Sequence, residues 1–289
     1  MQIQKSFQTS ENGKLYLVPT PIGNLKDMSI RSIEVLKEVD LIAAEDTRNT
    51  QKILNHFEIE TKKTSFHEHN KETKINTLID ILKNGESIAQ VSDAGMPSIS
   101  DPGHELVEAC IKNNISVISI PGATAGLSSL IASGIAPQPN LFYGFLPRKI
   151  SEQKNSLNEV KDFPFTIIFY EAPHRLKKTL KSMVEILGDR EIVLAREVTK
   201  KYEEYLRGTI HEMINWFEEN EVRGEFVLLV SGNSNPQSNE DDPLVDLAID
   251  KQVQFLIDKG EKTNEAIKKI AKKNEIKRQE VYNIYHQID

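Results

Sequence analysis

The stretch Ser92–Gly103, SDAGMPSISDPG, joins a segment with the composition of a buried strand, ESIAQV, to one with helical periodicity, HELVEACI. A connection between a strand and a helix in an α/β unit usually takes about 2–6 residues. This one takes twelve, among them two aspartates, two glycines and two prolines. Glycine permits close approach to a ligand and proline stiffens a loop, so the composition favours a binding loop over a plain turn.

Strand-like and helical segments alternate on both sides of this loop. KLYLVPT is followed by SIRSIEVLKEV, DLIAAED by TRNTQKILNHF, and SVISI by ATAGLSSLIASG. This order predicts an α/β fold with a mostly parallel sheet covered by helices. The segment Gly134–Asn140, GIAPQPN, interrupts the pattern with two prolines and one glycine, which indicates a boundary between domains.

The second half has strand-like segments, such as FTIIFYEA, REIVLARE and EFVLLVSG, with fewer helices between them, and this predicts a mixed sheet. A polar, Asn- and Pro-containing stretch then has the composition of a linker. We therefore predict an N-terminal α/β domain over residues 13–135, a second α/β domain over 141–232, a linker over 233–243 and a helical C-terminal tail over 244–289.

Composition limits the classes of protein that the chain can represent. It has 289 residues, 38% of them hydrophobic and 27% charged, with no apolar run as long as a membrane span and no signal-peptide pattern at its start. Cys110 is the only cysteine, so the sequence predicts neither a disulfide nor a cysteine zinc site. The net charge of −7 argues against a protein that coats nucleic acid by charge alone. We expect a cytoplasmic protein without membrane association.

Three predicted strands of the first half end in unusual loops, at Val18–Asp27, at Ser92–Gly103 and at Pro121–Gly126. Each loop alone is compatible with ordinary turn chemistry. Ligands of open α/β sheets gather at the carboxyl ends of strands, however, so three such loops on one sheet favour a binding cleft. Asp93 is predicted to accept hydrogen bonds from ribose-like hydroxyls, and Asp101 to cap the helix that starts near Gly103. No loop matches a G-x-G-x-x-G or P-loop pattern.

Several motifs, in order along the chain, carry a resemblance to a known family. They are KLYLVPTPIGNLKDMSIRSIEVLKEVDLIAAEDTRNT, VSDAGMPSISDPG, IPGATAG, GFLPRK, FYEAPHR and LAREVTKKYEE, which together extend from about Gly13 to Gly232. With these motifs the chain resembles the ribosomal RNA small subunit methyltransferase I family of tetrapyrrole-methylase-like methyltransferases. Its members use S-adenosyl-L-methionine to methylate the ribose 2′-hydroxyl of a cytidine in 16S rRNA of the small ribosomal subunit. The resemblance implies a two-domain α/β fold with the cofactor folded into the cleft between the domains, and a homodimer.

The resemblance also implies which residues bind the cofactor. The first half is expected to supply loop residues from the three strand ends, and the second half to close the site. The implied positions are Pro21, Ile22, Gly23, Asp93, Ala94, Gly95, Met96, Ala123, Thr124, Tyr170, Glu171, Ala172, Ala195, Arg196, Gly224 and Glu225. Two of them have alternatives: Tyr170 either stacks on adenine or packs in the core, and Glu171 either touches the cofactor or orders Arg175.

Methyl transfer to a ribose hydroxyl is an in-line displacement that benefits from a positioned base or cation and requires no metal. Asp46 and Arg48, just past a strand end, are catalytic candidates, as is His69. His67 and His69 alternate along a possible strand and so share a face. They contact substrate or move a proton, or else they are solvated surface histidines. No third ligand stands at metal-binding spacing.

Basic residues near the expected cleft are candidates for contact with RNA phosphates. They are Arg148, Lys149, His174 and Arg175. In the tail, residues 262–282 contain seven basic and three acidic side chains on two short helical segments. This pattern either forms a helix-turn-helix that docks RNA or caps the fold with a solvated face.

Two other functions are compatible with the sequence. A methyltransferase of the same fold could act on a tetrapyrrole or a modified protein side chain. Alternatively, the chain could be a non-catalytic RNA-binding factor in subunit assembly.

Overall fold

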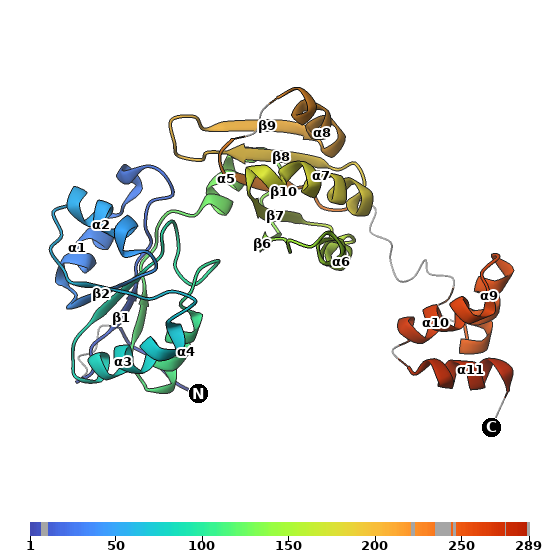
Figure 1. The fold of residues 1–289 in the computed structure, drawn as a ribbon, viewed down its shortest axis with the longest axis horizontal. Coiled ribbons are helices and arrows are strands. Elements are labelled where there is room, and N and C mark those ends of the chain that lie inside the picture. The colour runs from blue at the N-terminus through green and yellow to red at the C-terminus, as the bar shows by residue number, and fades with distance from the viewer. Residues whose placement is uncertain (7–10, 221–222, 235–243, 245–246, 275, 288–289) are drawn as a thin grey trace. The chain divides into compact units, whose positions relative to one another are not determined.

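The computed structural model describes residues 1–6, 11–220, 223–234, 244, 247–274 and 276–287. The chain forms two compact units, Met1–Asn233 and Ser234–Asp289 (Figure 1). The predicted linker over 233–243 lies almost wholly outside the described residues. No helix among the residues that the structure describes is long and apolar enough to cross a membrane.

The first sheet is parallel throughout and has the strand order β3-β2-β4-β1-β5. Its strands are β1 (Leu15–Leu17), β2 (Leu41–Ala44), β3 (Lys63–Ser65), β4 (Ile88–Val91) and β5 (Val117–Ser119). Between them run η1 (Leu25–Asp27), α1 (Ile30–Glu38), α2 (Thr47–His56), α3 (Lys71–Lys83) and α4 (His104–Lys112). The α/β fold expected from the alternating segments is confirmed.

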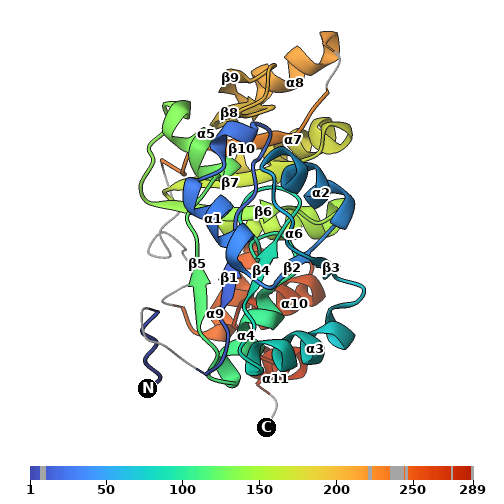
Figure 2. The same cartoon turned by 90° about the vertical axis from the view of Figure 1, so that its left-hand side faces the viewer.

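Both faces of this sheet are covered, because its strands alternate apolar side chains between two buried clusters. Ile42 of β2 packs in one cluster with Leu36 of α1 and Leu54 of α2. The neighbouring Ala43 packs in the other cluster, with Leu82 of α3 and Leu106 of α4. Figure 2 shows the parallel strands with these helices around them.

The second sheet is mixed, as predicted, and has the order β6-β7-β10-β8-β9. Its strands are β6 (Asn140–Phe145), β7 (Thr166–Glu171), β8 (Glu191–Arg196), β9 (Glu204–Thr209) and β10 (Phe226–Val230), and only β6 and β7 pair in parallel. One face is covered by α6 (Ile150–Val160), α7 (Pro173–Leu187) and α8 (Ile210–Glu219).

The opposite face of the second sheet packs against α5 (Ala125–Ser133), which follows the last strand of the first sheet. Leu130 of α5 belongs to a buried cluster with Ile168 of β7 and Val227 of β10. Residues 134–140 connect α5 to β6, and residues 1–233 pack as one unit, so a division into two domains there stays a prediction.

The long loop after β4 folds back over the end of its own strand. Gln90 is buried, and its Nε2 donates to the Pro102 carbonyl at 2.9 Å and to the Ser98 hydroxyl at 3.3 Å. Gly103, the residue before α4, has φ +144°, and a Cβ there would come within 1.7 Å of Gln90 Nε2. The prediction that Asp101 caps this helix is wrong, because Gly103 holds the cap position and no side chain makes a capping bond.

The second unit contains α9 (Ile249–Asp258), α10 (Thr263–Lys273) and α11 (Arg278–His286). The helices bury a small core of their own, which includes Val253, Ile267, Ile270 and Val281. Four residues separate α10 from α11, a spacing typical of a helix-turn-helix.

Replacement of Gly103 by alanine should destabilise the protein by about 3 kcal/mol or more, because backbone strain adds to the loss of the buried Gln90 hydrogen bonds. Gly134, also at positive φ (+90°) but with no atom within 4 Å of a Cβ, provides the matched control. There, Gly134→Ala should cost only about 1 kcal/mol. Urea unfolding of both variants measures the difference, and equal losses would contradict the role given to Gln90.

Candidate functional site

Three loops at the carboxyl edge of the first sheet converge on Gly95. Thr20 and Gly95 exchange two backbone hydrogen bonds, each of 3.0 Å. A Cβ on Gly95 would lie 3.4 Å from Ile22 Cγ2 and 3.6 Å from the Ala123 carbonyl oxygen. The structure thus brings together the predicted cofactor segments Pro21–Gly23, Asp93–Met96 and Ala123–Thr124.

The predicted residues of the second half also share one edge. Phe226, the first residue of β10, pairs with Glu171 of β7 on one side and with Arg196 of β8 on the other. The ends of β7 and β8 and the turn Gly224–Glu225 before β10 therefore lie together. This edge touches the first half, since a Cβ on Gly23 would lie 2.4 Å from Lys200 Cγ in the loop after β8.

Tyr170 and Ala195 have packing roles in this structure. The Tyr170 hydroxyl accepts a hydrogen bond of 3.0 Å from the Gly126 N–H, and its ring meets Phe142 and Phe145 edge-on. The arrangement supports packing over adenine stacking for this ring. Ala195 is fully buried in the cluster beneath α5.

Glu171 holds the start of α7 in place. Its buried carboxylate accepts from the Ala172 N–H at 2.9 Å and from the Thr179 hydroxyl at 2.6 Å, and it pairs with Arg175 Nε at 3.1 Å. Arg175 in turn donates from one terminal nitrogen to the carbonyls of Leu146 and Pro147. These bonds favour the alternative in which Glu171 orders Arg175.

The same bonds bring three exposed basic residues together. Arg175 ties the first turn of α7 to the loop after β6, so His174 lies near Arg148 and Lys149. Lys149 forms an exposed ion pair of 3.1 Å with Glu152. Arg196 at the end of β8 donates to the Arg223 carbonyl at 2.6 Å and pairs with Glu204 at 3.1 Å.

The ends of β2 and β4 are locked together through Asp93. Its Oδ1 accepts from the Asp46 N–H at 3.2 Å and its Oδ2 from Asn49 Nδ2 at 3.0 Å. In the reverse direction, the Asp93 N–H donates to Glu45 Oε2 at 3.2 Å. Glu45 and Asn49 were not among the predicted site residues, although both stand in the same EDTRN block as Asp46 and Arg48.

Asp46 and Arg48 form a pair at the start of α2. The Asp46 carboxylate caps the helix by accepting from the Arg48 N–H at 2.8 Å and pairs with the guanidinium at 2.7 Å. These bonds to Arg48 lower the pKa of Asp46 to about 2. The Arg48 side chain is 87% exposed, so its remaining donors are open to solvent or to a substrate.

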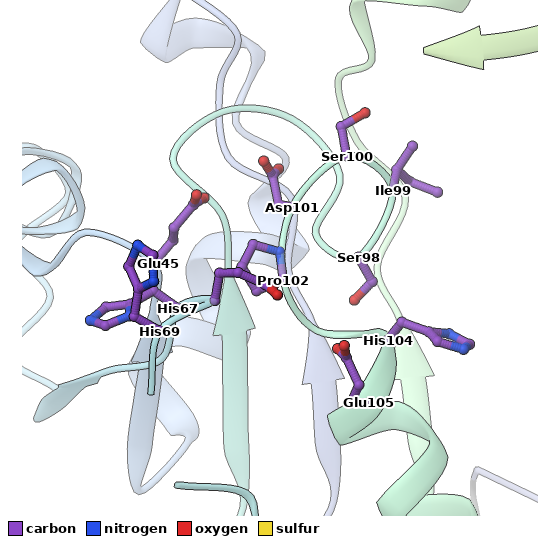
Figure 3. Close-up of a pocket in the computed structure, with 11 residues that line it drawn as sticks. Glu45, His67, His69, Ser98, Ile99, Ser100, Asp101, Pro102, His104 and Glu105 are labelled. Atoms are coloured by element: carbon purple, nitrogen blue, oxygen red, sulfur yellow. The ribbon is translucent and has the colours of Figure 1, made fainter. Parts of the chain in front are cut away.

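A cavity of about 530 Å³ opens beside the hydrogen bonds that join Asp93 to the Glu45–Asn49 segment (Figure 3). Its walls include Glu45, His67 and His69 on one side, Ser98–Pro102 along the loop after β4, and His104 and Glu105 at the start of α4. Burial raises the pKa of Glu45, and the neighbouring carboxylates of Asp101, Asp93 and Asp46 raise it further. Burial likewise raises the pKa of Asp101.

His67 and His69 lie close together, in a loop instead of on a strand. β3 ends at Ser65, so the expected strand through His67 and His69 is wrong, and both residues lie in the following loop. Their rings are 6.0 Å apart and line the same cavity. Within the described part of the chain, no group of three His, Cys, Asp or Glu side chains could hold a metal ion.

Known proteins of similar sequence and fold are methyltransferases. The family model for tetrapyrrole (corrin/porphyrin) methylases matches residues 14–214. The fold resembles the methyltransferase CobJ, with a TM-score of 0.58 at 19% identity over 77% of this chain and 95% of that one. It also resembles a uroporphyrin-III C-methyltransferase from Thermus thermophilus complexed with S-adenyl homocysteine, with a TM-score of 0.55 at 18% identity over 76% and 97%.

Relatives of much higher sequence identity show to which group within this family the chain belongs. A Streptococcus pyogenes protein named ribosomal RNA small subunit methyltransferase I is 53% identical over 100% of both chains. A Bacillus subtilis protein of the same name is 53% identical over 98% of both chains. The chain belongs to the tetrapyrrole methylase family, and within it to the ribosomal RNA small subunit methyltransferase I group.

Asp101→Asn should raise the melting temperature at about pH 7 by roughly 1–2 °C, because the substitution removes a carboxylate whose ionisation is penalised by burial. A raised pKa means that the folded state binds the proton more tightly, so the stability of the wild type falls as the pH rises from 3.8 through the raised value. The advantage of the variant should therefore shrink as the pH is lowered towards 4.

Thermal unfolding of Asp101→Asn across this pH range is the measurement. Asp80→Asn, on the exposed surface of α3, is the matched control and should leave the melting temperature unchanged at every pH. A constant advantage of Asp101→Asn at all pH values would contradict the role given to its ionisation.

Proposed function

We propose that the protein is an S-adenosyl-L-methionine-dependent methyltransferase that methylates the ribose 2′-hydroxyl of a cytidine in 16S rRNA of the small ribosomal subunit. The observation that carries the proposal is the 53% identity, over the whole chain, with relatives named for methylation of small-subunit ribosomal RNA. The convergence of three strand-end loops on Gly95 supports a cofactor site at that place. Because its substrate is the ribosomal subunit, the reaction takes place in the cytoplasm.

The residues around Gly95 fit such a cofactor. Gly95 itself is closely packed between Ile22 and Ala123, so the backbones of all three loops are within reach of one ligand. The Asp93 carboxylate has further lone pairs for ribose hydroxyls beyond its two bonds to the α2 segment. When bound, S-adenosyl-L-methionine supplies a methyl group on a cationic sulfonium. Met96, Ala94 and Thr124 of the first half, and Ala172, Arg196 and Glu225 of the second, complete the proposed site.

The proposed acceptor contacts lie around this site. Arg48 supplies an exposed guanidinium held at one end by Asp46, suited to a phosphate or to a developing negative charge. His69 lies in the cavity wall, where it is placed to contact the nucleotide. Arg148, Lys149 and His174 bind RNA phosphates, while Arg175 holds their two loops together. We further propose a homodimer, which sedimentation of the purified protein tests.

Transfer of tritium from labelled S-adenosyl-L-methionine to small ribosomal subunits tests the proposal. Label in a 16S ribose methyl group is the expected result. Label in a tetrapyrrole or protein acceptor instead would favour another activity of the same fold. Cofactor binding without any transfer would favour a non-catalytic assembly factor.

Asp93→Ala should weaken cofactor affinity more than about tenfold, as expected for a lost charge-assisted hydrogen bond of ~1.5–3 kcal/mol. Asn49→Ala removes the hydrogen bond from Asn49 Nδ2 to Asp93 and leaves the Asp93 carboxylate in place. It should therefore change the affinity less than about threefold. Calorimetric titration measures the cofactor affinity of both variants. Equal losses of affinity would mean that Asp93 acts only through its hydrogen bonds to the α2 segment.

The second unit is proposed to dock RNA. Lys268 and Lys272 are exposed one turn apart on α10, so Lys268→Glu with Lys272→Glu reverses charge on one face. Affinity for small subunits should fall, and the slope of log affinity against log salt should decrease by about one for each lost phosphate contact. Cofactor affinity should stay unchanged. Filter binding at several salt concentrations measures these slopes. Identical slopes for the wild type and the double variant would favour a solvated face that does not contact RNA.

A further inference from the structure

Glu45 belongs to both the cofactor loop and the neighbouring cavity. It follows β2 directly, and its Oε2 accepts a 3.2 Å hydrogen bond from the Asp93 N–H, within the loop that converges on Gly95. The same side chain lines the 530 Å³ cavity with His67 and Asp101. Figure 3 shows the carboxylates of Glu45 and Asp101 towards the same end of that cavity, with the imidazoles of His67 and His69 beside Glu45. One carboxylate is thus held at the boundary between two sites.

We propose that Glu45 is the catalytic residue that takes the proton from the acceptor ribose hydroxyl, and that His67 binds the same nucleotide in the cavity. The inference rests on the proposed function and deepens it. The cavity falls within the range of about 300–1,000 Å³ that small-molecule sites occupy, and most of the residues that line it have polar or charged side chains that can hydrogen-bond to a nucleotide.

Two neighbouring acids at the strand ends, Asp93 and Asp46, are occupied or unsuited. Asp93 accepts from two N–H donors of the α2 segment. Asp46 caps α2 and pairs with Arg48, and its pKa of about 2 makes it a weak base. Glu45 has one bond from Asp93 to fix its position and a second oxygen available to accept a proton. Its raised pKa brings its basicity closer to neutral pH, where general bases work best.

The proposed step balances without a further reactant. The 2′-oxygen forms a bond to the methyl carbon as the carbon–sulfur bond of the sulfonium donor breaks, and that electron pair stays on sulfur. The hydroxyl proton passes to Oε1 of Glu45 and is released to water afterwards. The carboxylate is regenerated, and the step needs no oxidant or reductant.

His67 provides an independent indication of a ligand in the cavity. Its Nδ1 is buried and has no hydrogen-bond partner among the residues that the structure describes. An unpaired buried polar atom is unfavourable, and in native proteins such atoms usually bond to protein, to water or to a bound ligand. A turn of the imidazole towards the cavity that His67 lines would let the hydroxyl of a ribose or the edge of a base satisfy this nitrogen. Lys71 pairs with both Glu68 and Glu105 and so joins the histidine loop to α4 across the cavity wall.

Glu45→Gln is the decisive variant, because its amide oxygen still accepts the Asp93 N–H but cannot take a proton. Single-turnover methyl transfer to small subunits should slow by about 100-fold or more, the usual contribution of a general base. Cofactor affinity by calorimetry should stay within about threefold of the wild type. Glu72→Gln, exposed on α3 and outside the cavity, is the matched control and should transfer methyl at the wild-type rate.

The outcomes separate the two proposals. No transfer by the wild type means that the proposed function fails, and the role of Glu45 fails with it. Transfer by the wild type with a Glu45→Gln rate within about threefold overturns the role of Glu45 alone. Should Glu45→Gln lose its folded melting transition, Glu45→Asp, which keeps the charge and withdraws it by one methylene, carries the same test: a wild-type rate overturns the inference.

A readout without catalysis completes the test. Carbon-detected NMR of the protein alone, with Glu45→Gln to assign the signal, should give Glu45 a pKa above 4.5. The titratable groups that face it belong to β2–α2, to the β3–α3 loop and to β4–α4: Asp46, Asp93, Asp101, His67, Glu68, His69, His104 and Glu105. A pKa at or below 4.5 contradicts the environment on which the proposal depends.

His67→Phe tests the binding role, since phenylalanine fills similar space without the nitrogens. The KM for small subunits should rise by about fivefold to tenfold, and the rate at saturation should change little, as expected for loss of one hydrogen bond used in binding. An unchanged KM would remove His67 from the proposed site and leave the test of Glu45 intact.

Discussion

The reciprocal hydrogen bonds between the Asp93 segment and the Glu45–Asn49 segment hold the functional edge of the first sheet together. β2 and β4 are parallel neighbours, so their carboxyl ends lie about 4.8 Å apart, and two loops must leave the sheet at almost the same point. Bonds of 3.0–3.2 Å run in both directions between these loops and fix each against the other. The position of Gly95, the start of α2 and the carboxylate of Glu45 all follow from this arrangement.

Helix α5 links this edge to the second sheet. It begins directly after the Ala123–Thr124 loop and buries Leu130 among strand residues of the second sheet. The bond from the Gly126 N–H to the Tyr170 hydroxyl joins its first turn to the end of β7. Movement of the second sheet would therefore be transmitted to one of the three loops that meet at Gly95, because both are attached to the same rigid element.

Most of the fold could be predicted from the sequence, since its elements have strong and distinct periodicities. The run IAQV is buried at every residue and forms β4, whereas HELVEACIK forms α4 and buries Leu106 and Cys110, about one helical turn apart. The parallel first sheet and mixed second sheet follow from the order of such segments. The errors fall at loops: Asp101 does not cap α4, and β3 ends before His67. There the conformation depends on distant partners, such as Gln90 bonding to the Pro102 carbonyl.

The sequence by itself determined the α/β class, the three glycine- and proline-containing loops, and the motifs that assign the family. These features reside in local composition and in the order of residues along the chain. Only the tertiary structure decided which polar atoms already have partners. It showed that the Glu171 and Asp46 carboxylates form ion pairs with neighbouring arginines, whereas Glu45 is fixed at a cavity beside an unpaired His67 nitrogen. The hydrogen bonds between the Asp93 segment and the Glu45–Asn49 segment, and from Arg175 to Leu146, join residues some 30–50 positions apart in the chain, and no periodicity in the sequence records such a pairing.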